Sequence, residues 1–300
     1  MRVISLLPSA TEMVFALGHG RELVGRSAEC DFPAEARTLP VVMHPRTWDA
    51  DAASAAIDAR VTETRGRGES LYALDIAEIA RLQPDVLLTQ DLCGVCSVTG
   101  PEVEEACARA GVRPRVVSLT PRSLGEVWTS VETVANALED AGAGNALAAT
   151  LRARSSPSGA LTGQRVAVVE WLDPPILAGL WVPEMVRSAG GEPVGPPPAE
   201  PGERTSWSAI GAAEPDLVIL SPCSFPVERT RRELSSPSLR QAIAALGRPP
   251  LGVFLADEAY FSRPGPRLAD GVDLLRHLLE GNPWESPMPV APWTGLEAGA

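Results

Sequence analysis

The chain has 300 residues, of which 45% are hydrophobic and 21% are charged, a composition typical of folded globular proteins rather than disordered or fibrous ones. Its 26 Lys and Arg residues against 38 Asp and Glu residues give a formal net charge of −12, and no basic run marks a nucleic-acid-binding surface. The longest apolar stretches fall short of the ~20 residues that a membrane-spanning helix needs. The length exceeds what one ordinary core requires, which predicts two packed units.

Strand and helix patterns alternate along the first part of the chain. Residues 3–7 form a short apolar run that predicts the first strand, and the Ser9-x-x-Glu12 pattern behind it is typical of a helix cap. Further elements are predicted as a strand at 23–26, a helix at 74–82 and a strand at 85–89. This alternation favours a parallel sheet covered by helices.

The middle of the chain has a different pattern. Between residues 121 and 155 the apolar positions fall on one face of a long helix, after which strands are predicted at 165–170, 217–220 and 251–255. The predicted organisation is an N-terminal α/β lobe (1–120), a connecting helix (121–155), a C-terminal α/β lobe (156–284) and a tail (285–300). Residues 79–88 and 210–219 both lead from a helix through Pro-Asp into a strand, which indicates a weak internal repeat, one copy in each lobe.

The start of the sequence has no basic segment, long apolar core or cleavage site, so we expect no signal peptide and a cytoplasmic protein. Free thiols in a reducing compartment are expected for the cysteines, which are odd in number. They are Cys30, Cys93, Cys96, Cys107 and Cys223.

Ligands of open parallel sheets bind beyond the carboxyl ends of the strands, where loops and helix N-termini meet. The polar and aromatic residues in or near such positions are therefore the candidate ligand contacts. They are Ser9, Thr11, Glu29, Cys30, Asp91, Glu170, Trp171, Trp181, Asp257, Tyr260 and Arg263.

The cysteines also form a candidate metal site. Cys93-x-x-Cys96 has the spacing with which two thiolates reach one metal, and Cys30 and Cys223 follow other strands. Together the four thiols could hold zinc or an iron–sulfur cluster, or supply a nucleophile and a resolving thiol. Burial as small apolar side chains is the alternative for each of them.

Other residues have two interpretations as well. Trp171 and Trp181 flank a proline-stiffened segment and could hold a planar ligand, or they could pack in a core. Arg263 and Arg267 lie in a rigid loop that suits an anionic group, and an ion pair with an acidic neighbour is the alternative. His44 is a further candidate for the ligand site.

Several segments together resemble a known family. The opening Ser5-Leu-Leu-Pro-Ser-Ala-Thr-Glu12, the Pro84-Asp85 lead-in and the loop Arg263-Pro-Gly-Pro-Arg267 resemble substrate-binding proteins of ABC importers for cobalamin and iron-siderophores, over residues 1–282. Residues 28–33, 89–96 and 222–223 are similar to a cobalamin-binding branch without an export signal. The resemblance implies two Rossmann-like lobes with parallel sheets, joined by one rigid helix as in class III periplasmic binding proteins. It also implies a tetrapyrrole-like or chelated-metal ligand in the cleft.

The sequence departs from this branch at two positions. The branch often has His before the Glu-Cys pair and before the Trp-Val-Pro-Glu segment, where this chain has Ala28 and Leu180. If those histidines contact the ligand, the departure implies a changed ligand.

Three hypotheses for the function follow. The leading one is a cytoplasmic binding or carrier protein for a corrinoid such as cobalamin or another metal chelate, as a monomer or homodimer, with no nucleic-acid partner and no membrane insertion. The second is an enzyme on the same scaffold that uses the cysteines as metal ligands or nucleophile. Its acid/base groups would be Glu29, Asp91, Glu170 or Asp257. The third is an exported importer subunit with a wrongly assigned start.

Overall fold

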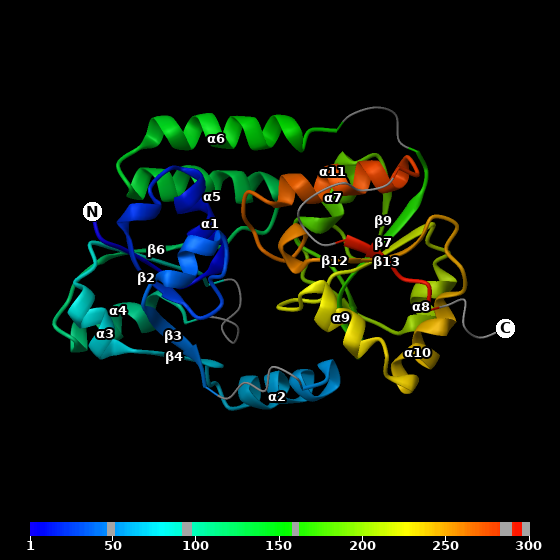
Figure 1. Ribbon diagram of the computed structural model, residues 1–300, viewed down its shortest axis with the longest axis horizontal. Coiled ribbons are helices and arrows are strands. Elements are labelled where there is room, and N and C mark those ends of the chain that lie inside the picture. The colour runs from blue at the N-terminus through cyan, green and yellow to red at the C-terminus, as the bar shows by residue number, and fades with distance from the viewer. Residues whose placement is uncertain (47–51, 92–97, 158–161, 283–289, 296–300) are drawn as a thin grey trace. The chain divides into compact units, whose positions relative to one another are not determined.

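The computed structural model describes residues 1–46, 52–91, 98–157, 162–282 and 290–295. The chain divides into two compact units (Figure 1). Unit 1 comprises Met1–Ala52, Ala59–Pro121 and Gly125–Leu151, and unit 2 comprises Ala53–Asp58, Arg122–Leu124 and Arg152–Ala300. Each unit contains its own sheet, as the sequence predicts.

The sheet of unit 1 has the strand order β4-β3-β2-β1-β5-β6. All neighbours are parallel except β4, which runs antiparallel to β3. The strands are β1 (Val3–Ser5), β2 (Leu23–Ser27), β3 (Val41–Pro45), β4 (Tyr72–Leu74), β5 (Val86–Thr89) and β6 (Arg115–Ser118). The carboxyl ends of the parallel strands therefore meet at one edge of this sheet.

Helices cover both faces of this sheet. The helices between residues 8 and 154 are α1 (Pro8–Ala16), α2 (Ser54–Gly66), α3 (Ile76–Leu82), α4 (Gly100–Arg109), α5 (Leu124–Ala137) and α6 (Ala141–Arg154), with short 3-10 turns at Gly20–Glu22 and Ala34–Thr38. The first residues of α2 belong to unit 2. Ile79 of α3 and Val103 of α4 pack with Ile4 and Leu87 of the sheet in one buried cluster. Figure 1 shows α1 and α5 on the opposite face.

The sheet of unit 2 has the order β10-β8-β7-β11-β12-β13, with β9 beside β7. Strands β9, β7, β11 and β12 are parallel, whereas β8, β10 and β13 run antiparallel to their neighbours. The strands are β7 (Arg165–Leu172), β8 (Pro175–Leu177), β9 (Glu192–Val194), β10 (Glu203–Arg204), β11 (Leu217–Leu220), β12 (Gly252–Ala256) and β13 (Val290–Pro292). Strand β13 lies in the segment 285–300, which the sequence predicts as a tail outside the C-terminal lobe, and it forms the edge of the sheet.

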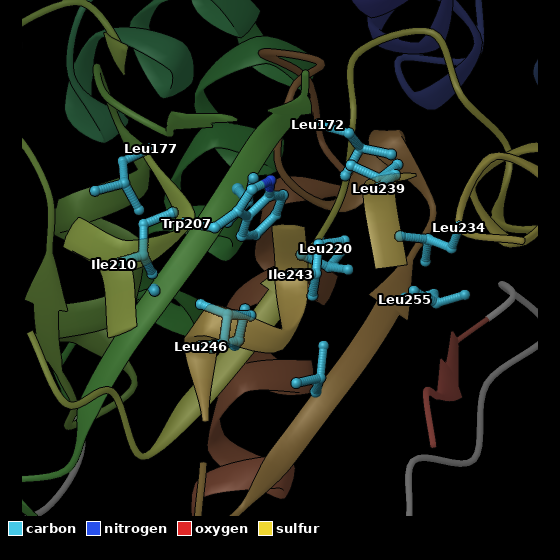
Figure 2. Packing of buried hydrophobic residues seen from close by; sticks show 14 of the residues in the cluster. Leu172, Leu177, Trp207, Ile210, Leu220, Leu234, Leu239, Ile243, Leu246 and Leu255 are labelled. Carbon is cyan, nitrogen blue, oxygen red and sulfur yellow. The ribbon is translucent and has the colours of Figure 1, made fainter. Parts of the chain in front are cut away.

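Buried side chains from α8 and α10 pack on one face of this sheet (Figure 2). Trp207, Ile210 and Ile243 belong to the same cluster as Leu220 and Leu255 of the central strands. The helices of unit 2 are α7 (Val182–Ser188), α8 (Trp207–Ala212), α9 (Val227–Glu233), α10 (Pro237–Ile243) and α11 (Leu268–Leu279), with 3-10 turns at Ala244–Leu246 and Glu258–Tyr260. No helix in the described parts of the chain has the length and hydrophobicity needed to span a membrane.

The segment 121–155 forms two helices, so the expectation of a single connecting helix is wrong. Helix α5 ends at Ala137, Glu139 adopts a left-handed φ of 62°, and the Asp140 carboxylate accepts from the N–H of Ala143 at 3.1 Å at the start of α6. A Cβ on Gly144 would lie 2.4 Å from the Cβ of Ala135, so α5 and α6 pack closely against each other. The apolar pattern continues through the break because both helices bury one face.

Candidate functional site

The hydroxyl groups behind β1 stabilise the start of α1. Ser9 and Thr11 are 3% and 0% exposed, and the Thr11 hydroxyl donates to the carbonyl of Leu7 at 3.3 Å. Ser5 donates to the same carbonyl at 2.9 Å. Because α1 begins at Pro8 and its N-cap is Leu7, Ser9 lies inside the first turn, and the predicted cap at Ser9 is wrong by two residues. Both hydroxyls belong to the interior of unit 1.

The loop behind β2 presents one carboxylate and one aromatic ring to solvent. Glu29 is half-buried, and Phe32 is 44% exposed, one of two large apolar side chains that stand out from the described surface. Cys30 is 0% exposed, and its thiol lies 3.9 Å from the carbonyl oxygen of Ser5. In this loop Glu29 and Phe32 are accessible to a ligand, whereas Cys30 is part of the core.

Asp91 and His44 lie at the carboxyl ends of two other strands of unit 1. The Asp91 carboxylate accepts from the N–H of Gly100 at 2.7 Å and from the Ser118 hydroxyl. It therefore joins the start of α4 to the end of β6. His44 is exposed on β3, opposite Ala73. Helix α4 also begins with a capping box, in which Thr99 and Glu102 take the two reciprocal positions and which is not among the predicted features.

In unit 2, Glu170 lies at the carboxyl end of β7. The residue is half-buried, and burial raises the pKa of its carboxyl to about 7. No hydrogen bond or ion pair joins this carboxyl to any residue in the described ranges. An acidic group in such surroundings at a strand end is a candidate for ligand contact.

An aromatic group lies beside it. The rings of Trp171 and Phe225 pack edge to face with centroids 5.3 Å apart, and the Arg229 guanidinium lies 3.7 Å from the centroid of Phe225. Trp171 is half-buried, and its indole N–H is buried without a hydrogen-bond partner in the described structure. This group can offer both an aromatic surface and an unused donor.

Arg263 forms an ion pair with an acidic neighbour, which was the alternative to its binding an anionic ligand. Its guanidinium contacts the Glu258 carboxylate, and the two side chains are 12% and 11% exposed. The second oxygen of Glu258 accepts from the N–H of Ser224. Burial raises the pKa of Glu258, and the Arg263 charge opposes this effect. The hydrogen bond between Ser224 and Glu258 joins the loop behind β11 to the loop behind β12.

The remaining candidates of unit 2 have structural contacts. Trp181 is 4% exposed and donates its indole N–H to the carbonyl of Phe261 at 2.7 Å, and Tyr260 is 0% exposed. The Asp257 carboxylate accepts from the N–H of Ala259 at 3.0 Å and caps the short turn after β12. In this structure Trp181 and Tyr260 belong to the core, which corresponds to the packing alternative for Trp181.

The predicted thiol site stays a prediction. Cys93 and Cys96 lie outside the described residues, Cys30 is buried and Cys223 is exposed. The described residues contain no group of three or more His, Cys, Asp or Glu side chains that could hold a metal ion. Within the part of the chain that the structure describes, neither Cys30 nor Cys223 belongs to a group of that size.

Two residues near these positions, Phe32 and Phe225, were not predicted as site residues from the sequence. Phe32 follows the Glu29-Cys30 pair, and its exposed aromatic ring next to a strand end was the available signal. Phe225 and Glu258 each lie close behind a predicted strand, but only the structure shows that they contact Trp171 and Arg263.

No protein-family model matches the chain. Among curated proteins, a vitamin B12-binding protein of Pectobacterium carotovorum subsp. carotovorum (strain PC1) is 54% identical over 41 residues, which are 14% of this chain and 15% of that protein. This match therefore covers only a short part of either protein.

Solved structures match nearly the whole chain. A periplasmic heme-binding protein from Pseudomonas aeruginosa is 19% identical with a TM-score of 0.68, and the match covers 97% of each chain. The heme-binding protein BhuT, in complex with two hemes, is 23% identical with a TM-score of 0.65 over 93% of this chain and 98% of BhuT. The vitamin B12-binding protein BtuF of Vibrio cholerae is 19% identical with a TM-score of 0.57, over 93% of this chain and 96% of BtuF. The chain has the two-lobed fold of class III substrate-binding proteins, which confirms the two α/β lobes that the resemblance implies.

Proposed function

We propose that this protein binds a large, flat metal chelate of the tetrapyrrole type, with a corrinoid as the first candidate and heme as the second. The observation that carries the proposal is the likeness of fold over at least 93% of the chain to proteins that bind heme or vitamin B12. The local match at 54% identity to a vitamin B12-binding protein favours the corrinoid.

The side chains of unit 2 support this ligand class. Trp171 and Phe225 form an aromatic group at the carboxyl end of the sheet, and the adjacent Glu170 carboxyl has no partner among the described residues. Flat ligands gain most of their binding free energy from apolar contact, and a few polar groups fix their orientation. In unit 1, the exposed ring of Phe32 and the carboxylate of Glu29 provide a similar combination.

Titrating the purified full chain with cyanocobalamin and with hemin tests the proposal by calorimetry and by the change in ligand absorbance. We expect a dissociation constant of about 1 μM or tighter for one of them, which corresponds to about −8 kcal/mol. Saturable binding of neither chelate would refute the proposal.

The Trp171→Ala variant tests whether the aromatic group contacts the ligand. Removal of the ring should weaken binding about fivefold, since an aromatic contact is worth on the order of 1 kcal/mol. Trp171→Phe is the matched control, because it keeps an aromatic face beside Phe225 and should retain most of the affinity. Equal affinity of the Ala variant and the wild type would show that the ligand does not contact Trp171.

We also propose a cytoplasmic location. The sequence has five cysteines, an odd number, and Cys107 is a free thiol in the structure, which suits a reducing compartment. Fractionation of cells that express the protein from its own gene, with detection by antibody, would decide the location. Recovery in the periplasmic or extracellular fraction would instead favour an importer subunit.

A further inference from the structure

Glu170 occupies an extra position in strand β7. The register pairs Val169 with Leu177 and Trp171 with Ile176, so β7 advances by two residues where β8 advances by one. Glu170 is the additional residue of a β-bulge. Bulges of this kind change the direction of a side chain and are frequent beside functional sites.

The Glu170 carboxyl packs against a glycine. A Cβ on Gly202 would lie 2.1 Å from Oε1 of Glu170 and 3.0 Å from its Cδ, so the carboxyl occupies the space that a side chain at this position would need. The residue remains half-buried and therefore keeps an open side. Within the described ranges the Glu170 carboxyl has neither a hydrogen-bond donor nor a cation, although buried polar groups in proteins usually have at least one hydrogen-bond partner.

The charged groups on the neighbouring elements do not compensate for this burial. Strand β8 has no charged residue, and the segment around Gly202 carries Glu200, Glu203 and Arg204. Arg204 is paired with Asp58 at 2.7 Å. The loop behind β11 contributes the backbone N–H of Cys223, which donates to the main-chain carbonyl of Glu170 and not to its carboxyl. Burial alone therefore raises the pKa of Glu170 to about 7.

We propose that Glu170 binds the ligand in its neutral form and donates its O–H to a carbonyl or carboxylate oxygen at the ligand edge, so that the ligand binds together with a proton. The inference deepens the proposed function and rests on it. A ligand that covers Glu170 removes its remaining water, and without a nearby cation this disfavours the ionised form further. The site therefore selects flat chelates whose edge carries amide or carboxylate groups.

Affinity as a function of pH tests this inference. Cyanocobalamin and hemin are titrated into the wild type between about pH 5.5 and about pH 8.5, a range that brackets the raised pKa. If only the neutral acid binds, affinity should fall up to about tenfold for each pH unit above that pKa, with uptake of up to one proton. Calorimetry in buffers of different ionisation enthalpy measures the proton uptake directly.

Two variants make the result specific for Glu170. Glu170→Gln places an N–H donor where the neutral acid has its O–H, so it should bind as tightly as the wild type at low pH and keep that affinity at high pH. Ionisation of the ligand itself affects both affinities equally, so it cancels in the ratio of wild-type to variant affinity. Glu203→Gln removes an exposed carboxylate close by and should keep the wild-type pH profile.

The outcomes separate the inference from the function on which it rests. Binding by the wild type with the same pH profile as Glu170→Gln would overturn the inference and leave the proposed function intact. A wild-type affinity that rises with pH relative to the variant would also overturn it, because the ligand would then contact the carboxylate through a donor. Absence of binding by either chelate at every pH would overturn both.

Discussion

Asp85 and Asp216 make the same hydrogen bonds in the two units. The carboxylate of Asp85 accepts from the N–H of Arg2 at 2.7 Å, and the N–H of Asp85 donates to the carbonyl of Arg2 at 2.8 Å. Asp216 forms the same pair of bonds with Arg165, also at 2.7 and 2.8 Å. Each aspartate therefore joins the start of its own strand to the first strand of its sheet, as expected for an internal repeat.

This equivalence predicts matched effects of mutation. Asp85→Ala and Asp216→Ala should each lower the free energy of unfolding by about 1 kcal/mol, the usual net value of a hydrogen bond at a partly exposed site. The Asn variants keep an oxygen acceptor and should lose less. Urea unfolding of all four variants measures the difference, and equal losses for Ala and Asn would show that the hydrogen bond is not the cause.

His19 should make the stability of unit 1 depend on pH. Its Nδ1 lies 2.9 Å from Glu22 and its Nε2 lies 3.1 Å from Asp140, and these hydrogen bonds, that to Glu22 first, raise the pKa of His19 above its ordinary value of 6.5. Because the folded pKa exceeds the unfolded one, the stabilisation is complete below about pH 6.5 and is lost as pH rises through the folded pKa.

Unfolding of the wild type and His19→Gln across this range tests the effect. As pH rises through this range, the free energy of unfolding of the wild type should fall by about 0.5 kcal/mol more than that of the variant. The value is small because all three side chains are partly exposed. Glu22→Gln should reduce the same dependence. If the stabilities of the wild type and His19→Gln changed with pH in parallel, His19 would not be the cause of the pH dependence.

The strands with continuous apolar runs could be predicted from the sequence. The strand predicted at 217–220 coincides with β11, and that at 85–89 differs from β5 by one residue. Strands β8, β9 and β13 have three residues each and contain proline, so they carry no periodic pattern. Their places depend on pairing with β7 and β12, which local sequence does not specify.

The candidate site could be predicted only in part. Glu170 and Trp171 were found because they end an apolar strand. The bulge at Glu170 and the close approach of Gly202 depend on the register between β7 and its neighbours. Trp181 was misleading, because an indole beside a proline-rich segment gives the same pattern in a core as at a ligand site.

Leu180 adopts a backbone conformation that disfavours its own side chain. Its φ is 52°, and the conformation is held by hydrogen bonds from its N–H to the carbonyl of Glu200 and from the N–H of Ala199 to its carbonyl. The left-handed region costs a residue with a Cβ about 1–2 kcal/mol, whereas glycine adopts it freely. Histidine, which the resembling branch often has here, tolerates it better than leucine.

The comparison of two substitutions at this position tests the strain. Leu180→Gly should be more stable than Leu180→Ala by about 1 kcal/mol, although glycine is normally the less stable of the two. Both variants lose the contacts of the leucine side chain, so the difference between their free energies of unfolding reports the backbone strain. Thermal or urea unfolding measures it, and an Ala variant as stable as the Gly variant would remove the strain argument.

The cysteines separate the binding hypothesis from the enzyme hypothesis. An intact corrinoid or heme already carries its metal in a chelate, so a protein that binds it needs no thiolate, and Cys93→Ser/Cys96→Ser should bind cyanocobalamin with wild-type affinity. Elemental analysis of protein purified without oxygen supplies the second measurement. If the wild type contains zinc or iron and the double variant loses it while remaining folded, the thiols are metal ligands, as expected when ligand groups rather than core groups are removed. Loss of chelate binding together with the metal would make the two sites interdependent, and would contradict the expectation that chelate binding needs no thiolate.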